Sequence, residues 1–147
     1  MKVKIDTSEY ISNLKQLIAD NHSVVLTVMG WSMMPFLRHQ EDRVLLTKTS
    51  RLPKVGDIVF YQRKTGQYVL HRIYRHRIDG YYIMGDHQLD LEGPIEPSAI
   101  FAIVTEVERN GHWILTNSFW WKSTSYIWRL LYPLRKLGYM ARKVICK

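Results

Sequence analysis

The amino-acid sequence predicts a mainly β protein with a short helix near its N-terminal end and an amphipathic helix at its C-terminal end. Two observations predict this class. Between residues 24 and 117, short runs rich in β-branched and aromatic residues alternate with turn residues, whereas outside that range apolar residues recur at helical spacing. A length of 147 residues with 46% hydrophobic residues suffices for one buried core. We therefore expect one domain at residues 1–117 and a helical tail at residues 118–147.

Residues 7–20 (TSEYISNLKQLIAD) are predicted to form the first helix. Tyr10, Leu14, Leu17 and Ile18 would share one face of it and pack against the rest of the protein.

Seven runs after this helix have the composition of β-strands. They are SVVLTVMG (23–30), DRVLLTK (42–48), VGDIVFYQR (55–63), YVLHRIYRHR (68–77), GYYIMGD (80–86), AIFAIVTEVER (99–109) and HWILTN (112–117). The last two are joined by Asn110-Gly111, which tolerates the positive φ angles of a tight hairpin turn. Six or seven strands at this spacing favour a small, mostly antiparallel barrel or sandwich.

The tail, residues 118–147, carries most of the net charge. It holds seven of the 21 basic residues and none of the 13 acidic ones, so residues 1–117 are nearly neutral. A basic groove across the body is therefore not predicted, which argues against nucleic acid as a partner. On a helix, six of these basic residues would lie opposite one aliphatic face; they are Arg129, Arg135, Lys136, Arg142, Lys143 and Lys147. The aliphatic face comprises Ile127, Leu130, Leu131, Leu134, Leu137, Ala141, Val144 and Ile145.

Two interpretations of this tail stay open. Lys and Arg opposite an aliphatic face, with Trp120, Trp121 and Trp128 nearby, are typical of a helix that lies in a membrane surface. Amphipathic helices also commonly cover an open side of their own domain. In either case Pro133 should kink the helix or begin a second segment.

No secretory signal and no membrane-spanning helix are expected. The N-terminal residues are charged throughout, and the most apolar window, residues 24–37, is interrupted by Gly30, Ser32 and Pro35. A spanning helix needs about 20 consecutive apolar residues. The expected location is the cytoplasm or the surface of a membrane.

Three segments hold residues suited to hydrolytic chemistry. Ser32 lies in Gly-Trp-Ser-Met-Met-Pro between two apolar runs, as either a turn residue or a nucleophile that would need a base. His71 lies in a strand where alternation places it on the face of Val69 and Ile73, as a core residue or as that base. Asp86 or Asp90 could orient its imidazole, although Asp86 could equally be a turn residue.

Together these segments resemble the type I signal peptidases and their relatives, the self-cleaving SOS and phage repressors. The resemblance covers about residues 24–107. The serine box Gly-x-Ser-Met-x-Pro is matched without a mismatch, and the later boxes follow in the same order. They are Gly30–Pro35, Asp42–Leu46, Gly56–Val59, the strand around His71, and the Gly-Asp box at Gly85-Asp86.

The resemblance implies a small antiparallel barrel or coiled sheet and a serine endopeptidase mechanism. Ser32 would attack, and His71 would replace the lysine base of the bacterial enzymes and the repressors, as in the Ser-His branch of the family. An Asp after the Gly-Asp box completes that branch, which favours Asp90, with Asp86 as the second candidate. Many relatives have Ser at the position of Gly30, so the oxyanion would here rest on backbone N–H groups, chiefly that of Ser32.

Substrate binding is also implied by the resemblance. An extended peptide or protein precursor would lie beside Gly30 and Trp31, with a small residue before the cut bond in shallow pockets near Met33 and Pro35. The substrate class would be a leader or signal segment of an exported peptide, with an exporter as a possible partner. The family's membrane anchors are not found in this sequence, and a tail bound to the membrane would replace them.

Other functions are less well supported by the sequence. Self-cleavage of the repressor type is not expected, because neither Ala-Gly nor Cys-Gly occurs. The alternative to an enzyme is a binding protein that uses its basic tail on a membrane or a nucleic acid. No cofactor is predicted. No metal site is predicted either, because no pair of candidate ligands has a tight metal-binding spacing; the candidates are His71, His76, His87, Asp86 and Asp90.

Overall fold

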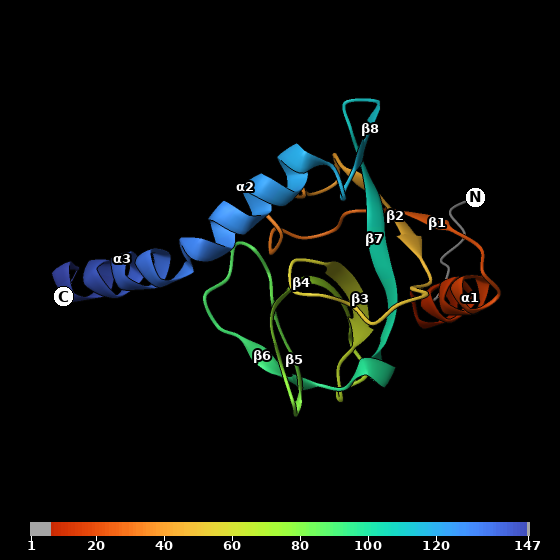
Figure 1. The fold of residues 1–147 in the computed structure, drawn as a ribbon, viewed down its shortest axis with the longest axis horizontal. Helices are drawn as coiled ribbons and strands as arrows, with labels where there is room; N and C mark the ends of the chain where they lie inside the picture. Colours follow the sequence, from red (N-terminus) through yellow and green to blue (C-terminus); the bar gives the residue numbers. More distant parts are fainter. Residues whose placement is uncertain (1–6, 147) are drawn as a thin grey trace.

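A computed structural model, which describes residues 7–146, contains one eight-stranded antiparallel sheet (Figure 1). This confirms the mainly β, antiparallel class, with more strands than the six or seven that the sequence predicts. The strand order is β1-β2-β7-β3-β4-β5-β6, and β8 pairs with β7 beside this path. The sheet is strongly curved, so β1 and β2 lie on one side of the molecule and β5 and β6 on the other. The strands are β1 (Val24–Thr27), β2 (Arg43–Thr47), β3 (Ile58–Gln62), β4 (Tyr68–Arg77), β5 (Gly80–Met84), β6 (Glu92–Ile95), β7 (Ile100–Arg109) and β8 (His112–Leu115).

The curvature divides the core into two clusters. One lies around β2, β7 and the first helix, and includes Val44, Leu46 and Val107, none of which is exposed. The other lies around β3, β4 and β5, and includes Ile73 and Ile83. Loss of this apolar surface from water is the main favourable contribution to folding.

Helix α1 (Thr7–Ala19) forms where it was predicted but buries a different set of side chains. Leu14 and Ile18 are buried in the first cluster and Ile11 packs against it, whereas Tyr10 and Leu17 are more than 40% exposed. Positions 11, 14 and 18 are the narrower i, i+3, i+7 stripe, and a helix on the rim of a sheet buries no more than such a stripe.

The structure also contains a strand that the sequence analysis missed. β6 contains Gly93 and Pro94, which are rare inside strands, and proline lacks the N–H group that a central strand needs. β6 avoids that cost because it lies at the edge of the sheet and pairs only with β5. The predicted hairpin does form between β7 and β8, with positive φ at both Asn110 and Gly111.

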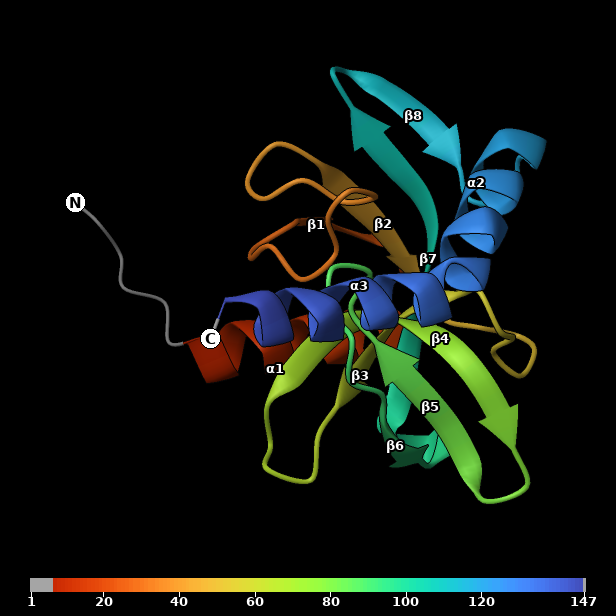
Figure 2. The same cartoon turned by 90° about the vertical axis from the view of Figure 1, so that its left-hand side faces the viewer.

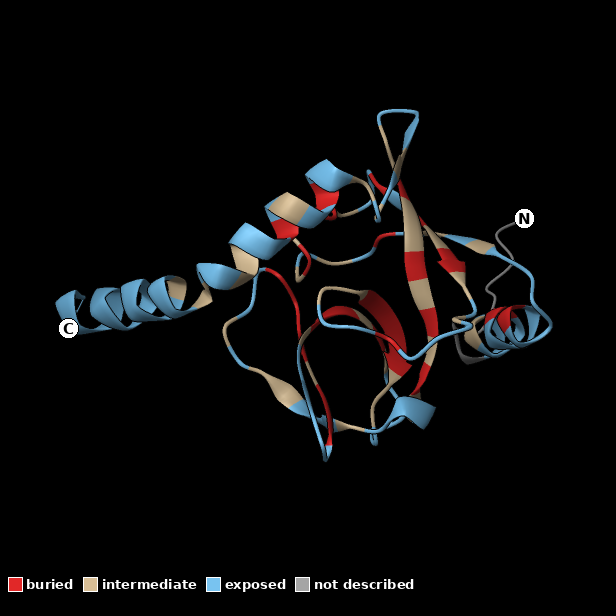
Figure 3. Cartoon of the chain, viewed as in Figure 1, coloured by how far each residue is buried: buried red, intermediate tan, exposed pale blue. Residues whose placement is uncertain are grey.

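The C-terminal tail forms two helices, α2 (Phe119–Leu130) and α3 (Tyr132–Ile145). The break falls beside Pro133, in the first turn of α3, where a missing N–H group costs nothing. α2 buries Trp121 and Ser125 against the sheet domain, whereas α3 extends beyond it and has no buried residue (Figure 3). In the turned view of Figure 2, α3 lies in front of the sheet domain. No helix within residues 7–146 is both long and apolar enough to cross a bilayer.

Candidate active site

Ser32 lies in the loop between β1 and β2. Gly30 begins this loop with φ +93°, a conformation that residues with a side chain rarely adopt, and its N–H group donates to His39 Nδ1 at 2.7 Å. After Ser32 the chain turns inward, because Met33 is 2% exposed and packs in the first core cluster. The loop therefore leaves Ser32 half-buried at the surface of a packed core.

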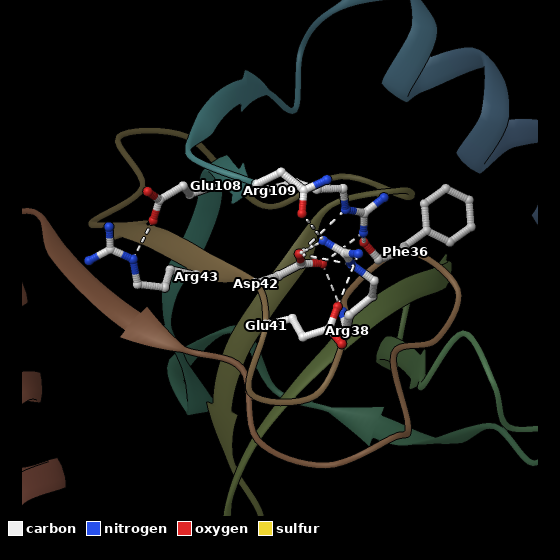
Figure 4. A network of polar contacts seen from close by, with 8 residues as sticks. Phe36, Arg38, Glu41, Asp42, Arg43, Glu108 and Arg109 are labelled. Atoms are coloured by element: carbon white, nitrogen blue, oxygen red, sulfur yellow. Dashed lines mark hydrogen bonds and ion pairs between the residues drawn. The ribbon is translucent and has the colours of Figure 1, made fainter.

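A buried carboxylate holds the far end of this loop (Figure 4). Asp42 is fully buried and accepts hydrogen bonds from Arg38 and Arg109, and Arg109 also donates to the Phe36 carbonyl at 2.7 Å. Burial alone would raise the pKa of Asp42, but the hydrogen bonds from the two arginines outweigh burial and lower it. The network ties the serine loop to β7.

His71 lies on β4 directly across from Val59 of β3, and its ring is 4% exposed. The sequence places it on the apolar face, and the structure also places it against the serine loop. His71 Nε2 lies 3.1 Å from Ser32 Oγ, which is hydrogen-bond distance for a nucleophile and its base. The 38 residues between Ser32 and His71 thus fold back to join the two side chains.

The surroundings of His71 keep its ring neutral. Burial and, to a smaller extent, the positive charge of Arg63 lower the pKa of His71 to about 4, against the opposing charges of Glu92 and Asp86. At neutral pH the imidazole therefore has a free lone pair. With the proton on Nδ1, Nε2 can accept a hydrogen bond from the Ser32 hydroxyl.

Neither predicted carboxylate contacts His71. Asp86 is fully buried, but its two oxygens accept from the guanidinium of Arg72, at 2.9 to 3.0 Å, and from the Tyr74 hydroxyl. Asp90 is exposed and lines a separate cavity. Within residues 7–146, His71 Nδ1 has no hydrogen-bond partner. The structure thus joins Ser32 to His71 and does not join either Asp to the pair.

A second ionic cluster near His71 was not foreseen from the sequence. Arg63 donates to Glu92 at 2.8 Å, and the Tyr61 hydroxyl donates to the same carboxylate. Burial tends to raise the pKa of Glu92, but these hydrogen bonds outweigh it and lower the pKa. Glu92 belongs to β6, the strand that the sequence analysis did not predict. The contacts of Glu92 with Arg63 and Tyr61 therefore become visible only in the folded sheet.

The loop after β5 fixes the backbone of Ser32. Gly85 passes so close that a Cβ atom there would lie 2.5 Å from the Ser32 carbonyl oxygen, and the His87 N–H group donates to the same oxygen at 2.8 Å. The C-terminal helices hold this loop from outside, since Trp128 Nε1 and Arg135 both donate to the Asp86 carbonyl oxygen at 2.9 Å. The tail thus supports the serine indirectly.

A cavity of about 280 Å³ opens beside the pair. Gly30 and Met33, two of the residues predicted to contact substrate, line it together with Ser32 and His71. The other two predicted residues, Trp31 and Pro35, are exposed and lie outside this lining, and the Trp31 ring packs on His39. Among residues 7–146, no three His, Cys, Asp or Glu side chains are grouped so that they could hold a metal ion.

This arrangement has the parts that acyl transfer requires: a hydroxyl, a neutral imidazole within hydrogen-bond distance, and a cavity open to both. No curated protein matches the sequence. A family described as Peptidase S24-like matches residues 2–88, more than half of the chain, a range that includes both Ser32 and His71. The chain therefore belongs to the Peptidase S24-like family.

Proposed function

We propose that this protein is a serine endopeptidase that uses Ser32 and His71 as a catalytic dyad and cleaves the leader or signal segment of an exported peptide or protein. The observation that carries the proposal is the 3.1 Å separation of Ser32 Oγ and His71 Nε2 beside an open cavity, in a chain of the Peptidase S24-like family.

The dyad would work as follows. Ser32 Oγ attacks the scissile carbonyl while its proton passes to His71 Nε2, giving a tetrahedral intermediate. The imidazolium then protonates the leaving amine, and an acyl-enzyme remains. Water, deprotonated by His71, attacks the ester and restores the Ser32 hydroxyl. Burial disfavours the imidazolium form of His71 that this mechanism requires. The negative charges of Glu92 and Asp86 stabilise that imidazolium and so oppose the effect of burial.

The oxyanion of the tetrahedral intermediate needs a hydrogen-bond donor close to Ser32. The Ser32 N–H group donates no hydrogen bond to another residue of the described chain, and it lies on the nucleophile itself. Gly30 has no side chain that could take part, so the backbone would supply this stabilisation.

Two neighbouring features support an apolar, extended substrate. β1 is an edge strand of the sheet, and Val28 and Met29, which follow it, line the cavity beside Ser32. An apolar groove of about 560 Å³ adjoins this cavity, and the two share Val28, Met29 and Leu70. A peptide strand added to β1 would place apolar residues in the groove. The buried Met33 side chain limits the room next to Ser32 and so favours a small residue before the cut bond.

The test is cleavage of matched peptides, each with an apolar segment upstream of Ala or of Leu, analysed by mass spectrometry. The proposal requires cleavage after Ala, with kcat/KM at least about tenfold lower for Leu. Ser32→Ala and His71→Ala should each lower kcat by about 1000-fold or more while the proteins stay folded. Cleavage that survives in either variant would exclude the dyad, and a preference for Leu would exclude the signal-type specificity.

A further inference from the structure

Helix α3 faces the protein with its polar side. Two of its side chains reach the body: the Tyr132 hydroxyl donates to the Leu89 carbonyl at 2.8 Å, and Arg135 donates to the Asp86 carbonyl. At 100° per residue both lie on the side of the helix opposite its aliphatic residues. The aliphatic face therefore points away from the sheet domain, the reverse of a helix that covers its own core.

The outward face is apolar and open. Leu134, Leu137, Val144 and Ile145 are 62% to 83% exposed, although burying such side chains is normally favourable. α2 does not share this arrangement, because it buries Trp121 and Ser125. α2 therefore packs on the domain through Trp121 and Ser125, although Ile127 and Leu130 of its aliphatic face stay exposed, and α3 presents an unpartnered amphipathic surface.

The basic residues around the aliphatic face of α3 indicate what kind of partner would bind there. Lys136, Arg142 and Lys143 are exposed on α3, and residues 118–147 contain no acidic residue. A second copy of the chain would bring two strongly basic helices together without a compensating carboxylate, which is unfavourable. Anionic lipid headgroups above an apolar layer satisfy both the basic residues and the aliphatic face.

We propose that α3 is a membrane-surface helix, which lies in the interface of an anionic bilayer with its aliphatic face toward the acyl chains. The helix is joined to the loop that holds Ser32 through Tyr132 and Arg135, so the bound protein would keep its active site at a fixed place near the membrane. This last consequence rests on the proposed peptidase function, whereas membrane binding itself does not.

The experiment is co-sedimentation of the full chain with phosphatidylglycerol–phosphatidylcholine vesicles and with pure phosphatidylcholine vesicles. We expect binding to the anionic vesicles that weakens as salt is raised. Replacing Lys136, Arg142 and Lys143 by Gln should lower the partition coefficient on the order of 100-fold. Leu134→Asn with Leu137→Asn should lower it roughly tenfold per leucine. None of these side chains is buried, so the thermal unfolding midpoint should not change.

Matched controls remove the same groups from the body of the protein. Leu52 and Leu115, which are 65% and 51% exposed, are replaced by Asn, and the exposed residues Lys64, Arg75 and Arg77 by Gln. The proposal requires both controls, and Ser32→Ala, to bind like the original protein, which separates this test from that of the peptidase. It is overturned if the controls weaken binding as much as the α3 variants do. It is also overturned if the full chain does not bind the anionic vesicles, or if it forms a dimer that the α3 leucine substitutions dissociate.

Discussion

At the scale of single residues, the sequence singled out Ser32 and His71, which the structure places 3.1 Å apart, but it did not predict what surrounds them. Ser32 and His71 were singled out by the resemblance of their boxes to those of the signal peptidases, whereas alternation alone placed His71 only on an inward face. The partner of Asp86 could not be predicted in the same way. Arg72 is next to His71 but points to the opposite side of the sheet, where it is fully buried and forms an ion pair with the Asp86 carboxylate.

The two aspartates should differ in what they contribute. Asp86→Asn leaves the buried Arg72 guanidinium without its counter-charge, so we expect the free energy of unfolding in urea to fall by about 3–5 kcal/mol. Asp90→Asn removes an exposed group and should change stability by less than about 0.5 kcal/mol and kcat by less than about twofold. A large loss of kcat in a stable Asp90→Asn protein would show that Asp90 orients His71 after all.

The buried His71 should make stability depend on pH. In the unfolded chain the ring takes up a proton near pH 6.5, whereas in the folded protein its pKa is about 4. Stability is therefore lost as the pH falls through this interval, by about 2 kcal/mol between pH 7 and pH 4.5. The measurement is the free energy of unfolding in urea at several pH values, for the original protein and for His71→Leu. The variant lacks the contribution of His71, and the contributions of the other histidines cancel in the difference between the two proteins.

Activity should show the same pKa. The acid limb of kcat/KM reports the base of the free enzyme, so half-maximal activity is expected near pH 4 rather than near pH 6.5. An acid limb near pH 6.5 would mean that His71 is solvated in the free enzyme, contrary to its buried position here.

At the scale of elements, the regular parts of the chain were predictable and their junctions were not. The strand runs and the β7–β8 hairpin follow from alternation and from Asn110-Gly111. β6 escaped prediction because Gly93 and Pro94 are tolerated only at a sheet edge, and which strand forms the edge is a property of the whole sheet. The division of the tail into a packed and an exposed helix likewise depends on contacts far along the chain, such as that between Trp128 and Asp86.

That contact gives a prediction for the tail as a support of the active site. Trp128→Phe keeps an aromatic ring beside Phe36 but removes the hydrogen bond to the Asp86 carbonyl, so the loop that carries His87 should loosen its hold on Ser32. We expect a loss of about 1 kcal/mol in stability and a fall in kcat of about tenfold, with KM nearly unchanged. Trp113→Phe on β8 is the matched control. Equal kcat values for the two variants would assign Trp128 a purely structural role.

At the scale of the whole molecule, the two proposed functions belong to different parts of the chain, which are connected through the loop after β5. The nearly neutral sheet domain holds Ser32 and His71, and the basic tail presents an apolar face on α3. The charge asymmetry along the sequence predicts a partner for the tail, and that prediction is tested by the vesicle experiment above. The sequence could not show which face of each helix packs on the sheet domain. A helical pattern shows which residues share a face of the helix, but not which of those faces is turned toward the rest of the protein.

The central claim is that Ser32, activated by His71, is a nucleophile. The most direct measurement is reaction of the purified protein with the p-nitrophenyl ester of N-acetylalanine, followed by intact-mass analysis and peptide mapping of the acylated residue. We predict one acyl group per chain on Ser32, none on Ser32→Ala, and acylation slowed by about 1000-fold or more in His71→Ala. Acylation at another residue, or an equal rate in His71→Ala, would contradict the account.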